Sequence, residues 1–222
     1  GSNTALTAQA PAEAQRIDLD GRVLMPGFID THGHVALFGL DELKVQLKGA
    51  ATKREILQRI EHAVKQASPG EWVICMPIGE PPYFPDADSI RAADQVPHCD
   101  ELDHIATNNP VYIQAPTNRV PNFAVLNSAA MRAAGIDVAT AVSPNTQVVK
   151  GSDGRATDIV AGAMQPIYNA DPLYQMVEQA APKPSYADSF KGIEQLSQHF
   201  VAHGTTTLLG AHLTHPDELR AY

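Results

Sequence analysis

Hydrophobic residues recur along the chain with the spacing of amphipathic helices and short strands. From Thr52 to Ala67 the apolar side chains follow a helical period, and Thr52 and Glu55 form a capping box at the start of this helix. A second long helix is predicted to begin after Ser185 and to end at Gly204. Amphipathic helices bury one face, so strands are expected beside them.

Several short segments have the composition of strands. Residues Ile17–Leu24 alternate apolar and polar side chains around Asp20-Gly21, which predicts a hairpin. In contrast, Phe123–Ala134 is predicted to be a helix that Gly135 ends. The alternation of strands and helices predicts the α/β fold class. Other predicted strands lie at residues 25–30, 71–78, 111–115 and 205–209.

The two ends of the chain suggest a fragment. Gly1-Ser2 resembles a remnant of cloning, and the residues up to about 15 are expected to be irregular. At the other end, Thr214–Tyr222 has the pattern of a helix that has just begun, with Thr214 at its N-cap. We therefore expect the chain to be part of a longer protein.

Composition and charge narrow the function classes. The chain has 222 residues, of which 44% are hydrophobic and 18% charged, which excludes a wholly disordered protein. Its net charge of −9 disfavours nucleic acid and membrane surfaces as partners. Cys75 and Cys99 are too few for a disulfide framework, so a reducing compartment, such as the cytoplasm, is favoured.

The sharpest chemical signal is the pair His32 and His34, separated by Gly33. Side chains two residues apart on an extended segment point to the same side, so both imidazoles can reach one cation. Neutral imidazole suits zinc and related divalent ions. Gly33 would let a ligand or a neighbouring backbone approach closely, and Asp30 could orient an imidazole as a hydrogen-bond acceptor beyond the ligands.

The other histidines carry weaker signals. His199 and His203 are four residues apart on the last long helix, but no Glu follows His199 as in HExxH, so a structural role is favoured. His212 follows the strand at 205–209 and could line a pocket at its end. The chain has no GxSxG, P-loop or GxGxxG motif, so serine hydrolase and nucleotide-binding functions have no support.

The segment from Ile17 to His34, with its Pro-Gly-Phe-Ile-Asp-Thr-His-Gly-His run, closely resembles the opening of the amidohydrolase superfamily. Three later stretches are similar to the family 3 branch, which includes N-substituted formamide deformylases. These stretches are Glu101–Ile113, Leu126–Ile136 and Asp153–Thr157, and a strand entry at His203–Thr207 also matches. The resemblance extends over nearly the whole chain.

The resemblance implies the N-terminal part of a (β/α)8 TIM-type barrel. Residues 1–24 would hold a tag, an irregular segment and a β-sandwich remnant, and residues 25–49 the first barrel strand. Residues 50–180 would form a large α/β insertion, and residues 181–222 the next barrel helix and strand, in truncated form. Members of this superfamily hold one or two divalent ions, here expected to be zinc, at the C-terminal mouth of the barrel.

The implied function is hydrolysis of amide-like C–N bonds by metal-activated water, with a small-molecule amide as substrate. By position, His32 and His34 match the metal ligands of the first strand. The catalytic base and the other ligands would lie beyond Tyr222, so this chain alone is expected to be inactive. The alternative is a non-catalytic, truncated or degenerate interaction module, which would form a homo-oligomer or pair with a complementary chain.

Three positions depart from the family pattern. Asn122 stands where relatives commonly carry His, Gly162 where they often place Glu, and Asp158 in place of a turn glycine. If these residues line the substrate pocket, the substrate class differs here.

Overall fold

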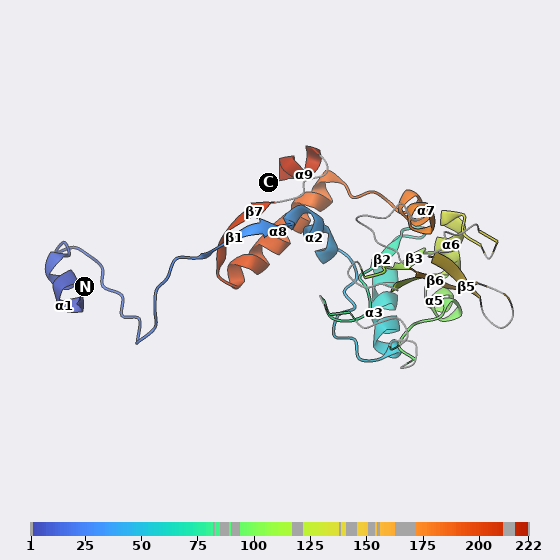
Figure 1. The fold of residues 1–222 in the computed structure, drawn as a ribbon, viewed down its shortest axis with the longest axis horizontal. Coiled ribbons are helices and arrows are strands. Elements are labelled where there is room, and N and C mark those ends of the chain that lie inside the picture. The colour runs from blue at the N-terminus through green and yellow to red at the C-terminus, as the bar shows by residue number, and fades with distance from the viewer. Residues whose placement is uncertain are drawn as a thin grey trace.

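The computed structural model describes residues 2–81, 83–84, 89, 94–116, 122–137, 139–140, 146–150, 154, 156–162, 172–210 and 216–221. Two sheets organise this part of the chain (Figure 1). A five-stranded sheet has the order β2-β3-β4-β6-β5, and a two-stranded sheet pairs β1 with β7. The mixed α/β class predicted from the sequence is confirmed.

The five-stranded sheet is mostly antiparallel. β2 (Val73–Cys75) pairs in parallel with β3 (Val111–Ile113), and β3 is antiparallel to β4 (Asn122–Leu126). β4 and β5 (Thr146–Lys150) flank β6 (Ala156–Gly162), both antiparallel to it. The parallel pair requires a crossover connection, and α5 (Cys99–Ile105) lies in the segment that joins β2 to β3.

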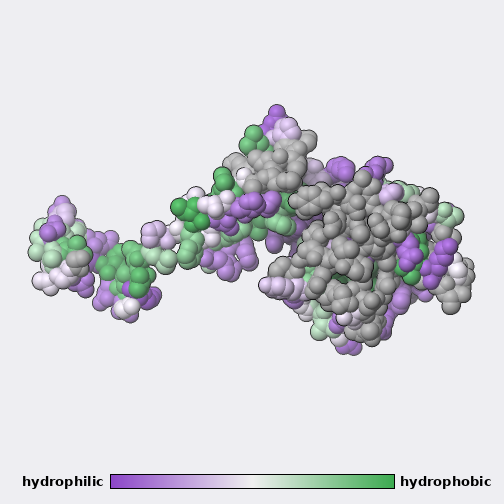
Figure 2. Space-filling model, in the orientation of Figure 1, coloured by the Kyte–Doolittle hydropathy of each residue, from purple (hydrophilic) through white to green (hydrophobic). Residues whose placement is uncertain are grey.

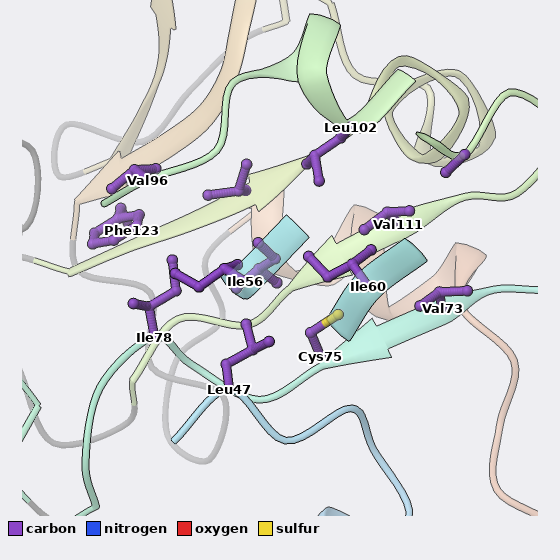
Figure 3. Packing of buried hydrophobic residues seen from close by; sticks show 13 residues of the cluster. Leu47, Ile56, Ile60, Val73, Cys75, Ile78, Val96, Leu102, Val111 and Phe123 are labelled. Carbon is purple, nitrogen blue, oxygen red and sulfur yellow. The ribbon is translucent and has the colours of Figure 1, made fainter. Parts of the chain in front are cut away.

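Helices cover both faces of this sheet because its strands bury alternate residues on opposite sides. One face packs on α3 (Lys53–Gln66) and α5 (Cys99–Ile105), and the other on α6 (Ser128–Ala134) and α7 (Pro172–Ala180). Figure 3 shows the first of these cores. It contains Leu47, Ile56, Ile60, Val73, Cys75, Ile78, Val96, Leu102, Ala106, Val111, Ile113, Phe123 and Val125.

The smaller unit is built on the parallel pair β1 (Phe28–Gly33) and β7 (Thr205–Gly210). α2 (Val35–Glu42) and α8 (Tyr186–Ala202) pack on it, and α9 (Pro216–Ala221) follows. Its core is small: Val35, Ala36, Ile193 and Leu196. The described strands close no barrel, so the TIM-type barrel and the division into 1–24, 25–49, 50–180 and 181–222 stay predictions.

α2 and α8 approach each other closely at two glycines. A Cβ on Gly39 would lie 2.6 Å from the carbonyl carbon of Gly192, and a Cβ on Gly192 would lie 2.4 Å from the carbonyl oxygen of Gly39. These neighbours are backbone atoms, which cannot move aside as a side chain can. α2 and α8 can therefore pack at this short separation only because neither Gly39 nor Gly192 has a side chain.

The hairpin predicted at Ile17–Leu24 is wrong. A turn forms, with Arg22 N–H donating to Leu19 O over 2.9 Å, but no strand flanks it. Val23 and Leu24 are more than 80% exposed, because no sheet lies against them. The segment joins α1 (Asn3–Gln9), itself unexpected, to β1 as an extended arm with hydrophobic surface (Figures 1 and 2).

The helix predicted over Phe123–Ala134 is wrong in its first half. Residues up to Leu126 form β4, because their aromatic and β-branched side chains alternate between the two cores. Asn127 then caps α6, and Gly135 ends it with a φ of +67°, as predicted.

Both long helices begin at the predicted N-cap, but only the second capping box is complete. The Glu55 carboxylate accepts from Ala51 N–H and not from Thr52 N–H, whereas the Asp188 carboxylate accepts from Ser185 N–H as predicted. Thr52 Oγ1 accepts a hydrogen bond from Glu55 N–H, and Ser185 Oγ accepts one from Asp188 N–H. Hydrogen bonds from the Ser185 side chain and backbone lower the pKa of the Asp188 carboxyl. Among the residues described, no helix combines the length and the apolar character needed to cross a membrane.

Candidate metal centre

The two imidazoles of the HxH pair meet where β1 ends and α2 begins. His32 lies within β1, and His34 is the residue immediately before α2. Their Nε2 atoms are 3.2 Å apart, and their ring centroids are 5.1 Å apart at an interplanar angle of 63°. His34 has left the extended conformation, with φ −113° and ψ 57°. The rings nevertheless converge as the spacing predicts.

Asp30 stabilises the backbone of this segment. Its Oδ1 accepts a hydrogen bond from the main-chain N–H of His32 over 2.9 Å. This hydrogen bond stabilises the main chain at His32 and occupies one oxygen of the Asp30 carboxylate. This contact is to the main chain and not to a ring, so the expected role of Asp30 in orienting an imidazole stays a prediction.

The neighbouring strand leaves little room for a side chain at Gly33. A Cβ on this residue would lie 2.9 Å from the Cδ atoms of Leu208 in β7. The neighbour that approaches Gly33 is therefore a side chain, whereas the sequence suggested a ligand or a backbone. Leu208 packs under β1 with the small core of α2 and α8, which gives the strand end firm support.

The pair is accessible to solvent and has an aromatic neighbour. His32 is exposed and His34 half-buried. The ring of Phe38, one helical turn along α2, contacts the His34 ring edge to face, with centroids 6.0 Å apart. Phe38 lies four residues after His34, so this ring contact follows from the helical spacing at the start of α2 and could have been predicted from the sequence.

The second histidine pair has the structural role favoured by the sequence. His203 Nδ1 donates to the main-chain oxygen of His199 over 2.8 Å, and His203 caps the C-terminal end of α8. His212 lies outside the described residues, so its place in a pocket stays a prediction. No group of three or more His, Cys, Asp or Glu within the described parts of the chain could hold a metal.

Two of the positions that depart from the family pattern lie opposite each other. Asn122 in β4 is the cross-strand partner of Gly162 in β6. The Asn122 amide donates to the main-chain oxygen of Pro116 over 2.9 Å, just after β3. A family His and Glu at these places would be adjacent, whereas this chain has a buried amide beside a residue without a side chain.

The stretches around Glu101 and Leu126 contact each other through two side chains. Asp103 Oδ1 accepts from the N–H of Ser128 at the start of α6, over 3.0 Å. Asn127 is fully buried, and its Oδ1 accepts from Val111 N–H and Ala130 N–H, each over 2.9 Å. These residues hold strands and helices together.

The side-chain amide of Asn127 makes two further hydrogen bonds, so this residue is a hub that joins several elements. Its Nδ2 donates to the main-chain oxygens of Ala106 and Asn109, over 3.3 and 3.0 Å. One side chain thus joins the end of α5, the loop after it, the start of β3 and the start of α6. The residues of these stretches pack within the five-stranded unit, and nothing in the sequence pattern indicated this hub.

Comparison with known proteins gives consistent results. Residues 15–222 match the model described as "Amidohydrolase family". The N-substituted formamide deformylase of Arthrobacter pascens is 31% identical over 71% of this chain and 27% of its own length. The putative amidohydrolase YtcJ of Bacillus subtilis is 29% identical over 70% of this chain and 29% of its own. The chain therefore spans less than a third of these relatives.

A solved structure shares the fold. An uncharacterized metal-dependent hydrolase from Pyrococcus furiosus superposes with a TM-score of 0.57 at 20% sequence identity. The match covers 98% of this chain and 38% of that one. At this identity the likeness concerns the fold.

Proposed function

The chain belongs to the amidohydrolase family, and from that premise we propose that it supplies two ligands, His32 and His34, to the divalent metal of an enzyme that hydrolyses amide-like C–N bonds. The observation that supports this proposal most directly is the 3.2 Å between the two Nε2 atoms. Zinc as the metal, in one or two ions, is part of the proposal.

The donor pair fits such an ion. Zinc binds imidazole nitrogen at about 2.0–2.1 Å with tetrahedral angles, which places two ligand nitrogens about 3.3 Å apart. The Nε2 atoms of His32 and His34 are therefore at the separation that one shared ion requires. The same distance also permits a hydrogen bond from one ring to the other. Metal titration separates these two interpretations.

His32 and His34 would hold the ion at a place open to solvent. Both imidazoles lie at the carboxyl end of β1, on a side open to solvent, so a substrate can approach. When bound, a divalent ion supplies Lewis acidity, which polarises a carbonyl and lowers the pKa of water. Catalytic zinc takes three protein ligands as a rule. We propose that the further ligands and the base come from outside the described residues.

Zinc affinity tests the proposal. Replacing both His32 and His34 by alanine should lower the affinity for Zn²⁺ at least tenfold, because two donors are lost. Isothermal titration of the 222-residue chain measures this change. The matched control is the double variant of His199 and His203, also to alanine, which removes two imidazoles from α8 and should leave the affinity unchanged.

The outcomes are separable. Equal losses in the two double variants would mean that zinc binds histidines without selection, and no loss in the His32 and His34 variant would exclude the pair as ligands. Substituting Co²⁺ adds a spectroscopic check, since its visible absorption reports imidazole ligation directly.

A second candidate function is an interaction module without catalysis, and the exposed strands favour it. Phe28 and Ile29 on β1 and Leu209 on β7 are each more than half exposed. Apolar residues on an open two-stranded sheet are an aggregation or pairing surface. Here we propose a second copy of the chain as the partner.

Light scattering after size exclusion tests this candidate. The wild-type chain should show about twice the monomer mass at high concentration, and Ile29→Lys should return it to monomer, because a charge on an exposed strand blocks pairing. Val201→Lys on α8, an equally exposed apolar site, is the control and should stay dimeric. A wild-type monomer at all concentrations would exclude this function.

A further inference from the structure

A cavity lies between α2 and the five-stranded sheet. It has a volume of about 450 Å³, within the range of small-molecule sites. α2 and the segment after it form one wall, and the ends of β2 and β3 form another, through Met76, Pro77, Gln114 and Ala115. Tyr174 and Glu178 of α7 complete the lining. The cavity thus joins the helix that follows the imidazole pair to the insertion.

Aromatic side chains give the cavity an apolar body. Phe38, Phe84 and Tyr174 contribute rings, and Leu37 and the end of β2 add aliphatic surface. Burial, together with a hydrogen bond to Glu178, raises the pKa of Tyr174, so its hydroxyl remains protonated. A ligand in this cavity therefore meets mainly ring faces and alkyl groups, which favour an aromatic or branched apolar group.

A polar cluster on Lys44 provides a directional contact. Lys44 Nζ lies 2.6 Å from Asp41 Oδ1 and 2.9 Å from Gln114 Oε1, and all three residues line the cavity. An ammonium group has three N–H donors. Among the described residues these two acceptors use two of them, which leaves one donor for a ligand. Gln114 is 70 residues from Lys44, so no sequence pattern reveals the cluster.

The charge of the lining selects a neutral ligand. Three carboxylates, from Asp41, Glu42 and Glu178, and two ammonium groups, from Lys44 and Lys48, line the cavity. Glu178 also lies 3.8 Å from the ammonium group of Lys183, an exposed residue outside the lining. Lys44 is already neutralised by Asp41, and both side chains are 23% exposed. An anionic ligand would meet a net negative lining, whereas a neutral carbonyl can accept from Lys44 without that repulsion.

We infer that this cavity binds the non-reacting part of an amide substrate: an uncharged group with an aromatic or branched apolar body and one carbonyl acceptor. The inference deepens the proposed function and rests on it for the reaction. The position agrees, because Phe38 lines the cavity and its ring also contacts the ring of His34. Substrate held here would lie next to the imidazole pair.

Binding of acetanilide tests the inference, in the presence of a chelator so that no metal takes part. This neutral phenyl amide should bind the 222-residue chain with a Kd on the order of 1 mM, as suits a ligand of its size. Oxanilate, in which a carboxylate replaces the methyl group, should bind at least tenfold more weakly. Ligand-observed NMR titration measures both.

Variants locate the site. Lys44→Met keeps the aliphatic stem and removes the donor, so acetanilide should bind at least fivefold more weakly. The control is Lys65→Met, which removes an ion-paired lysine from the outer side of α3, 2.7 Å from Glu61, and should not change binding. The inference fails if Lys44→Met folds and binds as well as the wild type, or if oxanilate binds as tightly as acetanilide.

A measurement on the wild-type chain covers the case in which Lys44→Met does not fold. Nuclear Overhauser contacts should connect the acetanilide ring to the ring protons of Phe38 and Tyr174, and contacts only to other residues would overturn the inference. The double alanine variant of His32 and His34 should still bind acetanilide. Unchanged zinc affinity in this variant would contradict the metal proposal alone, and failure of the wild-type chain to bind acetanilide would contradict this inference alone.

Discussion

Replacing Asn127 by alanine is expected to lower the free energy of unfolding of the five-stranded unit by about 3 to 5 kcal/mol. The Asn127 side chain is fully buried and bonds four main-chain groups, in Val111, Ala130, Ala106 and Asn109. Alanine leaves these groups without their partner in a place that water does not reach, and it also removes the N-cap of α6.

Urea unfolding followed by fluorescence measures this effect. Trp72 is the only tryptophan in the chain and packs against the core between the sheet, α6 and α7, so its signal reports this unit. Asn127→Ser keeps a cap acceptor for Ala130 and should recover about 1 kcal/mol. Asn108→Ala, an exposed neighbour, should change stability by less than about 0.5 kcal/mol. If Asn127→Ala lowers the free energy of unfolding as little as Asn108→Ala does, Asn127 does not stabilise the unit as a hub.

The second large effect is expected from Gly192→Ala in α8. In an exposed helix this change would be stabilising by about 1 kcal/mol. Here the new Cβ would lie 2.4 Å from the carbonyl oxygen of Gly39, so α2 and α8 must separate. We expect a net loss of about 2 to 3 kcal/mol from the small unit, because overpacking against backbone outweighs helix propensity.

Two observations distinguish a loss of stability in the small unit from a loss of stability in the whole chain. The far-UV circular dichroism of the helices should melt at lower temperature, while the Trp72 transition of the larger unit stays where it was. Zinc affinity should also fall, because α2 begins directly after His34. Ser197→Ala, at an exposed position on the same helix, is the control and should be nearly neutral. A rise in melting temperature for Gly192→Ala would show that the helices are not in close contact there.

Local signals in the sequence predicted the elements that depend on local chemistry. The N-caps at Thr52 and Ser185, the left-handed Gly135 and the short apolar strands at 111–115 and 205–209 all lead to the observed elements. These features succeed because a cap or a run of β-branched residues stabilises its own few residues, whatever surrounds them.

Features that depend on distant partners were not predictable. The sequence predicts a helix at β4, since Phe123–Leu126 is apolar at a length that suits either element, and only the pairing with β3 and β6 decides for a strand. The hairpin at Ile17–Leu24 had the right turn but no sheet to join. At the candidate metal centre the convergence of His32 and His34, and the contact of Phe38 with His34 one helical turn away, follow from spacing. The cluster on Lys44 does not, because Gln114 is 70 residues away.

The pairing of β1 with β7 has a consequence for the order of folding. Phe28 pairs with Thr205, so almost the entire chain lies between two strands that must meet in parallel. Contacts between residues so far apart in sequence form slowly, because the loop must be closed before they are made. The five-stranded unit between these strands folds around its own cores. Once it has folded, a compact body joins the two strands in place of a long flexible loop. The strand end that carries His32 is therefore completed late, after the five-stranded unit has brought its two flanks together.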